Sequence, residues 1–414
     1  MPWLSAPMKA RLCCNERVKG RDIGHTQAGI PGWGTQETRG IDMKQLLLAT
    51  SALVAFAGAA AAEVTVTGDA RIGLRYDDGL ACSTCADGTR SGWNTVSRAR
   101  AIFTMTGETD SGLSFGANFR ADQASRAVGG NGGSSSGTRG TVWISGTYGK
   151  LSAGDIDSGL ESAVGDLPEI GVSSLNYYNE MQYTGSDLDT EVYDEAGLLY
   201  EYKFGDASIY ASFMDQYVGY SGEKRLTGNS WSLGAGYNLG NYTFGIGYEK
   251  AGIFVDPVSY TYLNESLSDD ATVGVNVFDN DNRTWGISGG TSVAGITFKA
   301  IYLSTKVDGS NSIGSISSDD YDFRQYGIGA EYKMANGVQL AGYWRKLDGD
   351  SVLLANGLRS DNDANIYGIG AGYDLGGGAV VKGGIAHIEG TSAFLGGGRD
   401  IDRTIADFGL QLKF

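Results

Sequence analysis

Residues 63–76 read EVTVTGDARIGLRY, and apolar or small side chains alternate in this stretch with polar side chains or glycine. Because successive side chains of a β-strand point to opposite faces, the stretch predicts a strand that separates an apolar environment from a polar one. The end of the chain, residues 406–414, repeats the pattern. One face of this second segment carries Ala406, Phe408, Leu410, Leu412 and Phe414. Both ends of the region after residue 62 therefore predict strands of one kind.

Composition narrows the class of protein to which these strands belong. The chain has 414 residues, of which 65 are Gly and 5 are Pro, and 19% are charged. After residue 62, no uncharged apolar run reaches the length of about 18 residues that a membrane-spanning helix needs, which excludes a helical membrane bundle. The formal net charge of -16 argues against a nucleic-acid partner, since phosphate backbones bind clustered Lys and Arg. A soluble all-β protein and a transmembrane β-barrel remain.

The first 62 residues are predicted to lie outside the fold. Residues 43–62 have a Met-Lys start, a short apolar centre and a run of alanines, which is the pattern of a secretory signal peptide. An export signal is read at an N-terminus, so we interpret residues 1–42 as an upstream extension that arises from a start codon assigned too early. Residues 63–414 are then the exported domain.

The connections between the predicted strands indicate the architecture. The period-two alternation recurs between the two end strands, at about 96–107, 113–122, 141–148, 150–155, 197–204, 207–214, 230–239, 241–250, 284–293, 296–304, 326–334, 338–346, 365–375 and 379–388. Short turns with Gly, Asn or Asp alternate with long acidic connections. This alternation, with an even number of strands, is typical of outer-membrane barrels. We therefore predict an all-β fold, a transmembrane antiparallel barrel of about 16 strands with short periplasmic turns, long external loops and an open lumen. A soluble β-sheet protein is the alternative.

Several stretches resemble one known family. Residues 63–76, the hairpin at 103–117 and YGKLSAGD at 148–155 are followed in order by YGIGAGYDLGGG at 367–378 and the terminal Phe414. They resemble the general diffusion porins of alphaproteobacteria of the Rhodobacter type. The resemblance implies a homotrimer of sixteen-stranded barrels in the bacterial outer membrane, in which the third external loop folds inward and narrows each pore. A terminal aromatic residue resembles the signal that the outer-membrane assembly machinery reads.

A lumen of this width selects small solutes only if a loop narrows it. The longest loop, about 156–196, is the predicted constriction loop. With the preceding strand end it carries the carboxylates of Asp155, Asp157, Glu161, Asp166 and Glu169. The lumen-facing phase of three early strands carries the guanidiniums of Arg71, Arg75, Arg98, Arg100 and Arg120. If the loop crosses the opening, the two sets face each other, and we expect a transverse field and a weak preference for cations. Ion pairs between the arginines and neighbouring strands, without a role in transport, are the alternative.

Two smaller sites are suggested by residue type. Carboxylate oxygens are ligands that Ca²⁺ prefers, and the resemblance implies calcium binding in such a loop, so the five loop carboxylates are candidate ligands, although their spacing matches no EF-hand. Cys82 and Cys85 are the cysteines that follow residue 62. Export to an oxidising compartment favours a local disulfide between them over a redox pair. No cofactor is predicted to be required.

Together these features predict a passive, water-filled outer-membrane channel for ions and small hydrophilic solutes rather than an enzyme. His387 is the single histidine after residue 62, which leaves nucleophilic catalysis without an evident base. A solute-selective channel with a binding site in its lumen and an outer-membrane hydrolase barrel are the competing functions. The expected partners are further copies of the chain in a homotrimer, outer-membrane lipid and lipopolysaccharide, and the diffusing solutes.

Overall fold

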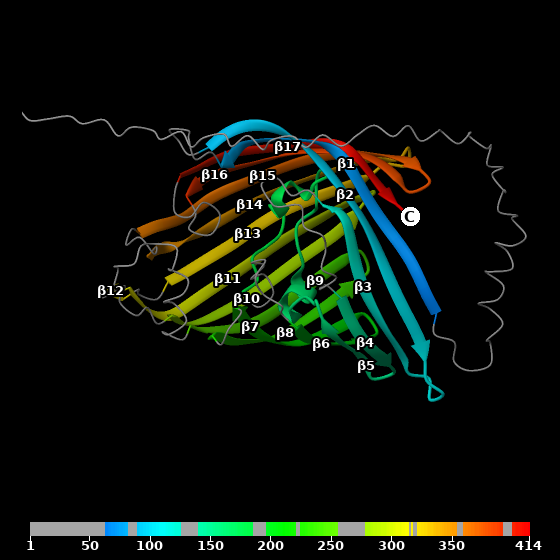
Figure 1. Ribbon diagram of the computed structural model, residues 1–414, viewed down its shortest axis with the longest axis horizontal. Coiled ribbons are helices and arrows are strands. Elements are labelled where there is room, and N and C mark those ends of the chain that lie inside the picture. Colours follow the sequence, from blue (N-terminus) through cyan, green and yellow to red (C-terminus); the bar gives the residue numbers. More distant parts are fainter. Residues whose placement is uncertain are drawn as a thin grey trace, which may run out of the picture. The chain divides into compact units, whose positions relative to one another are not determined.

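The computed structural model describes a sheet built from long antiparallel strands (Figure 1). The described residues are 63–81, 89–125, 140–184, 196–220, 224–255, 278–313, 316–317, 321–353, 359–391 and 400–414. Residues 1–62, with the predicted signal peptide, lie outside them, and so do Cys82 and Cys85 with their predicted disulfide.

The strands follow one another along the chain, and their bounds fall into two groups around the ring. The first group is β1 (Glu63–Ala81), β2 (Thr89–Glu108), β3 (Ser114–Ser125), β4 (Gly140–Gly146), β5 (Gly149–Gly154), β6 (Ala196–Phe204), β7 (Ala207–Tyr220), β8 (Lys224–Leu239) and β9 (Tyr242–Val255). The second group is β10 (Phe278–Val293), β11 (Ile296–Ile313), the two-residue β12 (Ile316–Ser317), β13 (Tyr321–Lys333), β14 (Val338–Leu353), β15 (Arg359–Gly376), β16 (Ala379–Thr391) and β17 (Asp400–Lys413).

The sheet closes on itself because β1 pairs with both β2 and β17. The closure is sealed at the end of the chain, where the N–H of Phe414 donates to the carbonyl of Gly68 at 2.8 Å and the N–H of Gly68 donates back at 3.1 Å. Apart from the short β12, sixteen strands of the described part form the ring, which confirms the predicted barrel. A closed ring leaves no sheet edge with unpaired backbone groups, as a membrane requires.

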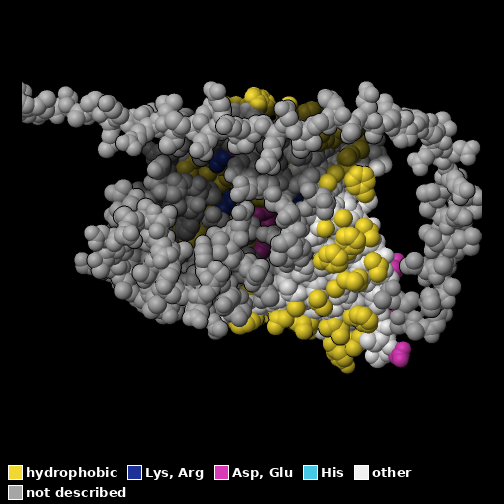
Figure 2. All heavy atoms as spheres, viewed as in Figure 1, with side chains coloured by type: hydrophobic (Ala, Val, Ile, Leu, Met, Phe, Trp, Pro, Cys, Tyr) yellow, Lys and Arg dark blue, Asp and Glu magenta, His cyan; other side chains and the backbone are white. Residues whose placement is uncertain are grey.

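The period-two pattern determines which side chains face outward. Ile72 on β1 is 61% exposed, Ile369 on β15 is 69% exposed and Phe408 on β17 is 65% exposed, whereas Arg75 on the opposite face of β1 is buried. Figure 2 shows hydrophobic side chains gathered over the outside of the strands around β3 to β5. Exposed apolar side chains on an outer wall are stable only against hydrocarbon, so the outer face is the lipid-facing face.

The strands extend further toward the long loops than the alternation predicted. The first strand ends at Ala81 rather than near Tyr76, and β8 begins at Lys224 rather than near residue 230. The physical reason is that ladder hydrogen bonds need no apolar face, so polar hairpins continue the pairing beyond the lipid-facing band. The short turns fall where they were predicted, for example at 205–206 and 240–241.

Two short helices lie between β5 and β6, α2 (Gly159–Val164) and the 3-10 helix η1 (Ser174–Tyr177). Neither these nor any other described helix is long and apolar enough to cross a membrane. The main buried hydrophobic cluster includes side chains from this segment and from the inner faces of β11 and β14 to β17. The core of the molecule therefore lies inside the barrel, between the loop and the wall.

Candidate pore constriction

The segment from Asp155 to Thr184 follows β5 and folds into the barrel, as expected for the third external loop (Figure 1). Its first turn is α2, which starts where the hydroxyl of Ser158 accepts the N–H of Glu161 at 3.1 Å. The helix ends at Gly165, whose φ of 61° lies in the left-handed region that favours glycine. These local signals make the chain turn back after one short helix.

The barrel wall receives the start of α2 with hydroxyl groups. The N–H of Gly159 donates to Ser212 Oγ on β7 at 3.0 Å, and the N–H of Leu160 donates to Ser232 Oγ on β8 at 3.2 Å. The first N–H groups of a helix have no partner within the helix, so these two bonds satisfy them. Close approach also needs glycine in the wall.

Gly234 on β8 and Gly245 on β9 lie directly under the helix. A Cβ atom at Gly234 would collide with the carbonyl of Gly159, and one at Gly245 would collide with the carbonyl of Ala163. The glycines therefore make room for the helix on the inner wall.

Apolar side chains hold the middle of the loop against the opposite part of the wall. The buried residues of the loop are Leu160, Val164, Leu167, Ile170, Leu175, Met181 and Tyr183, and those of the wall are Ile301, Leu303, Tyr343, Ile366, Ile388 and Ile405. Full burial of one such side chain stabilises by roughly 1.5–3 kcal/mol. This packing fixes the loop on one side of the lumen and leaves its other edge facing the opening.

Asp407 on β17 anchors the loop before η1. Its carboxylate accepts the N–H of Val172 at 2.9 and 3.1 Å, the N–H of Ser173 at 2.6 Å and the hydroxyl of Ser173 at 2.6 Å. The following residues Ser174, Leu175 and Tyr177 have positive φ, which costs energy for residues other than glycine. The buried carboxylate offsets that cost by holding the turn in place.

A second polar anchor lies on β13 and β14. Arg345, which is 2% exposed, donates to the carbonyls of Tyr178 and Glu180, and to Gln325 Oε1 at 2.7 Å. Gln325 in turn exchanges two hydrogen bonds with the backbone of Gln182, at 2.8 and 2.9 Å. The loop is thus bonded to the wall on both sides of its apolar patch.

The predicted arginines lie on the wall beside the opening. Arg98 and Arg100 on β2 share one partner, Asp69 on β1, with Arg98 Nε 3.1 Å and Arg100 Nη1 3.8 Å from its carboxylate oxygens. Their side chains are 14% and 18% exposed. Two of the predicted guanidiniums are therefore ion-paired within the wall, which is the arrangement that the alternative interpretation expected.

The other arginines divide between the loop and the wall. Arg71 reaches the loop, since its Nη1 donates to the carbonyl of Val172 at 3.4 Å. Arg75 is buried and pairs with Asp77 at 3.0 Å, and Arg403 on β17 pairs with the same carboxylate at 2.7 Å. Arg120 lies partly buried on β3. The structure thus brings Arg71, rather than the whole set, into contact with the loop.

The loop carboxylates point to different surroundings. Glu169 accepts the hydroxyl of Ser174 at 2.7 Å, and its charge acts on Arg71. Asp166 accepts the N–H of Met181 at 2.7 Å. Glu161 lies in α2 and is partly buried. Among the five predicted carboxylates, Glu169 is the one placed beside the arginine cluster.

Two of these carboxyl groups have shifted acidity. Partial removal from water raises the pKa of Asp157, and the charges of Asp155 and Glu201 raise it further. Removal from water also raises the pKa of Asp166, although the Met181 N–H and the positive charge of Lys299 act in the opposite direction. Both groups therefore hold a proton more tightly than an ordinary aspartate.

The five loop carboxylates do not fit a calcium site. Within the part of the chain that the structure describes, no three acidic, histidine or cysteine side chains lie close enough together to hold a metal ion. Asp166 and Glu169 also direct their oxygens to the hydrogen-bond donors of the loop itself. These carboxylates hold the loop together rather than a cation.

Sequence reasoning missed the residues that position the loop. Asp69, Gln325, Arg345 and Asp407 are polar or charged residues at inward-facing positions of predicted strands. A charged residue on the lumen phase signals a polar contact inside a barrel, but the alternation does not show which loop atom lies opposite.

A closed barrel with an apolar outer wall and a charged lumen narrowed by a loop defines a membrane-spanning channel. The sequence model of the family described as Gram-negative porin matches residues 49–393. A porin of Rhodobacter capsulatus is 32% identical over 306 residues, which cover 68% of this chain and 93% of that protein, and a porin of Fuscovulum blasticum is 24% identical over the same length. The chain belongs to the Gram-negative porin family, and it is an outer-membrane porin.

Solved structures give the same result for the fold. A porin structure that is 29% identical superimposes with a TM-score of 0.60 and covers 85% of this chain and 100% of its own. A loop-deletion mutant of OmpT from Vibrio cholerae, 14% identical, has a TM-score of 0.56 and shows the fold alone. The similarity to porins favours a channel rather than an enzyme.

Proposed function

We propose that the channel allows passive diffusion of ions and small hydrophilic solutes through a constriction that is polarised between an arginine cluster and the edge of the loop. One observation carries this proposal. Arg71 lies where the two sides meet, because it donates to the loop carbonyl of Val172 and interacts with the charge of Glu169. The basic wall and the acidic loop edge are therefore neighbours across the opening.

The charge balance of the wall supports a field at this point. Arg71, Arg98 and Arg100 act on one another electrostatically, and Asp69 is the carboxylate that pairs with Arg98 and Arg100. Three guanidiniums and one carboxylate leave a positive excess on the wall. Two opposite unit charges about 8 Å apart interact by roughly 2 kcal/mol at an effective dielectric constant of about 20. A field of that size orients water and dipolar solutes.

Reconstitution in planar bilayers tests the proposal. We expect stepwise conductance from the full-length chain and, in a KCl gradient, a reversal potential that shifts toward cation preference in the double variant Arg98→Gln, Arg100→Gln. The double variant Lys203→Gln, Lys333→Gln is the control, since it removes the same charge from exposed side chains near the turns. An unchanged reversal potential in the arginine variant contradicts the polarised constriction. Current that saturates with one solute would favour a solute-selective channel instead.

We also propose that the channel is a homotrimer, with the low wall of β4 and β5 turned toward a neighbouring copy. These strands contain 7 and 6 residues, fewer than the roughly 9–11 that a tilted strand needs to cross the hydrocarbon. Their outward side chains Val142, Ile144 and Leu151 are exposed. A second copy would cover this part of the wall where lipid alone would not match its height.

Crosslinking measures the subunit number. Cysteine introduced at Val142 is expected to give crosslinked dimers and trimers in outer membranes, whereas cysteine introduced at Ile246, on the lipid-facing side of β9, is expected to give none. Crosslinks at Ile246 but not at Val142 would place the interface elsewhere.

A further inference from the structure

An outward-facing row of aromatic rings crosses five neighbouring strands on the side of the ring away from β4 and β5. The row consists of Tyr248, Trp285, Tyr302, Tyr326 and Trp344, on β9, β10, β11, β13 and β14. Ring centroids are 5.2 Å apart for Trp285 and Tyr302, 6.4 Å for Tyr302 and Tyr326, and 5.8 Å for Tyr326 and Trp344. Aromatic rings of this kind mark the border between hydrocarbon and headgroups.

A row of basic side chains lies directly beyond the aromatic row, toward the long loops. It consists of Lys250, Arg283, Lys306, Arg324 and Lys346. On four of the strands the basic residue is two positions from the ring, and on β11 it is four positions away, so both rows share the outward face. Arg283 stands directly opposite Lys250 on one side and Lys306 on the other.

Like charges at directly opposed positions destabilise a sheet, so the row needs compensating anions. Three of its members have acidic partners at the same rim, at 2.9 to 3.0 Å. Lys306 and Arg324 are exposed, and neither forms an ion pair with any residue that the structure describes. Two cationic groups at headgroup depth are therefore available to an external anion.

The basic row is specific to this sector. On other strands, the outward residue two positions beyond an outward aromatic ring is Ser91 on β2, Asn229 on β8, Asn365 on β15 and Glu389 on β16. The cations are thus concentrated over β9 to β14, whereas the aromatic border continues around the barrel.

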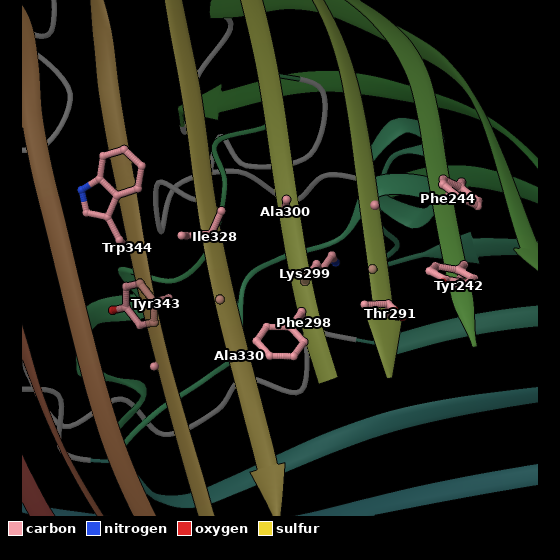
Figure 3. Close-up of a pocket in the computed structure, with 14 residues that line it drawn as sticks. Tyr242, Phe244, Thr291, Phe298, Lys299, Ala300, Ile328, Ala330, Tyr343 and Trp344 are labelled. Carbon is pink, nitrogen blue, oxygen red and sulfur yellow. The ribbon is translucent and has the colours of Figure 1, made fainter. Parts of the chain in front are cut away.

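The same five strands carry an apolar groove on the hydrocarbon side of the aromatic row (Figure 3). Its volume is about 680 Å³. Bulky side chains border it, namely Phe244, Phe298, Ile328 and Trp344, and small residues form its floor, namely Gly289, Ala300, Ala330 and Gly342. Trp344 belongs to both the groove and the aromatic row, two positions below Lys346, so the groove opens toward the basic row.

We propose that this sector binds one phosphate-bearing lipid of the external leaflet, with an acyl chain in the groove and the phosphate between Lys306 and Arg324. The strands here contain 13 to 18 residues, enough to cross the hydrocarbon, so the sector faces lipid rather than a low wall that needs a second copy. A phosphate supplies the missing negative charge, and the chain fills the apolar groove. The site does not depend on the proposed constriction.

Native mass spectrometry of the full-length protein in detergent tests the site with two lipid probes that have the same acyl chains, phosphatidic acid and diacylglycerol. Phosphatidic acid is expected to bind more tightly, and the double variant Lys306→Gln, Arg324→Gln is expected to weaken its binding roughly tenfold. The double variant Lys203→Gln, Lys333→Gln, with the same loss of charge near the turns, is expected to bind like the unmodified chain. Ala330→Trp fills the groove without changing charge and is expected to weaken both probes.

Several results would overturn the proposal. Equal binding of the two probes, or an equal loss in both double variants, would remove the role of Lys306 and Arg324. Displacement of phosphatidic acid by inorganic phosphate alone would remove the role of the groove. A change in the number of copies per particle in Ala330→Trp, with lipid binding unchanged, would make this sector a subunit interface. Far-UV circular dichroism confirms that each variant retains its sheet.

Discussion

Asp407 and Val172 are 235 positions apart in the chain, yet both carboxylate oxygens of Asp407 accept the backbone N–H of Val172, at 2.9 and 3.1 Å. The last strand of the barrel thereby holds the loop that follows the fifth. Because the carboxylate is buried, each bond is made where water cannot replace it. The shape of the opening therefore depends on one side chain of the wall.

Replacing that side chain should release the loop. Asp407→Asn removes the charge and at least one acceptor, which costs about 1–3 kcal/mol when buried N–H groups are left unpaired. Limited proteolysis is expected to cut the variant between residues 155 and 184, and its single-channel current is expected to fluctuate more. Asp402→Asn, on the outward face of the same strand, is the control. Resistance to protease equal to that of the unmodified chain would show that Asp407 does not hold the loop.

Wall glycines should control how closely α2 approaches. Gly245→Val places a side chain against the carbonyl of Ala163 and is expected to push the helix into the lumen, which lowers single-channel conductance. Gly236→Val is the matched variant, because a Cβ atom at Gly236 would have its nearest neighbour at 3.8 Å, an ordinary contact. Equal conductance of the two variants would mean that the helix does not border the conducting path.

The acidity of the loop should appear in the pH dependence of selectivity. The raised pKa values of Asp157 and Asp166 mean that these groups take up protons while ordinary carboxylates are still ionised. Cation preference is therefore expected to begin to fall at a higher pH than for exposed carboxylates, as a reversal potential in a salt gradient would show. Tighter proton binding in the folded state also means that lowering the pH through this range stabilises the loop.

The double variant Asp157→Asn, Asp166→Asn isolates this effect. It is expected to lose the early step in the pH profile and to keep the later one that arises from the remaining carboxylates. Asp110→Asn, in the exposed turn after β2, is expected to keep both. A profile of the double variant identical to that of the unmodified chain would assign the early step to other groups.

Phe414 should matter for assembly more than for the stability of the finished barrel. Its ring is 78% exposed, whereas its backbone makes the two hydrogen bonds with Gly68 that close the sheet. Phe414→Ala keeps those bonds, so the free energy of unfolding is expected to change by about 0.5 kcal/mol or less. Heat-modifiable mobility on gels is expected to show a lower yield of folded protein in outer membranes. A normal yield would argue against an assembly signal at this residue.

The alternation from Glu63 to Tyr76, with its repeats, predicted the ring and the lipid-facing side of each strand. It worked because a strand between lipid and water must place one kind of side chain on each face, whatever its neighbours are. It did not predict the outer ends of the strands, such as Lys224, because backbone pairing there continues without an apolar face.

The candidate site was predicted only in part. Residue type and phase located Arg71, Arg98 and Arg100 on the lumen wall, but Asp69, which pairs with two of them, follows from register between β1 and β2. The loop carboxylates could be identified from the sequence, yet which one meets the arginines depends on how the loop packs. Glu169 lies beside Arg71, and Asp166 turns to Met181 and Lys299.

The sequence by itself determined that this chain is a membrane barrel, because local alternation and turn residues act over a few positions and are legible without a partner. The tertiary structure alone decided the form of the opening. Asp407, Arg345, Gly234 and Gly245 meet the loop only after the ring has closed, since residues far apart in the chain are brought together by strand register and by the burial of the loop against the wall.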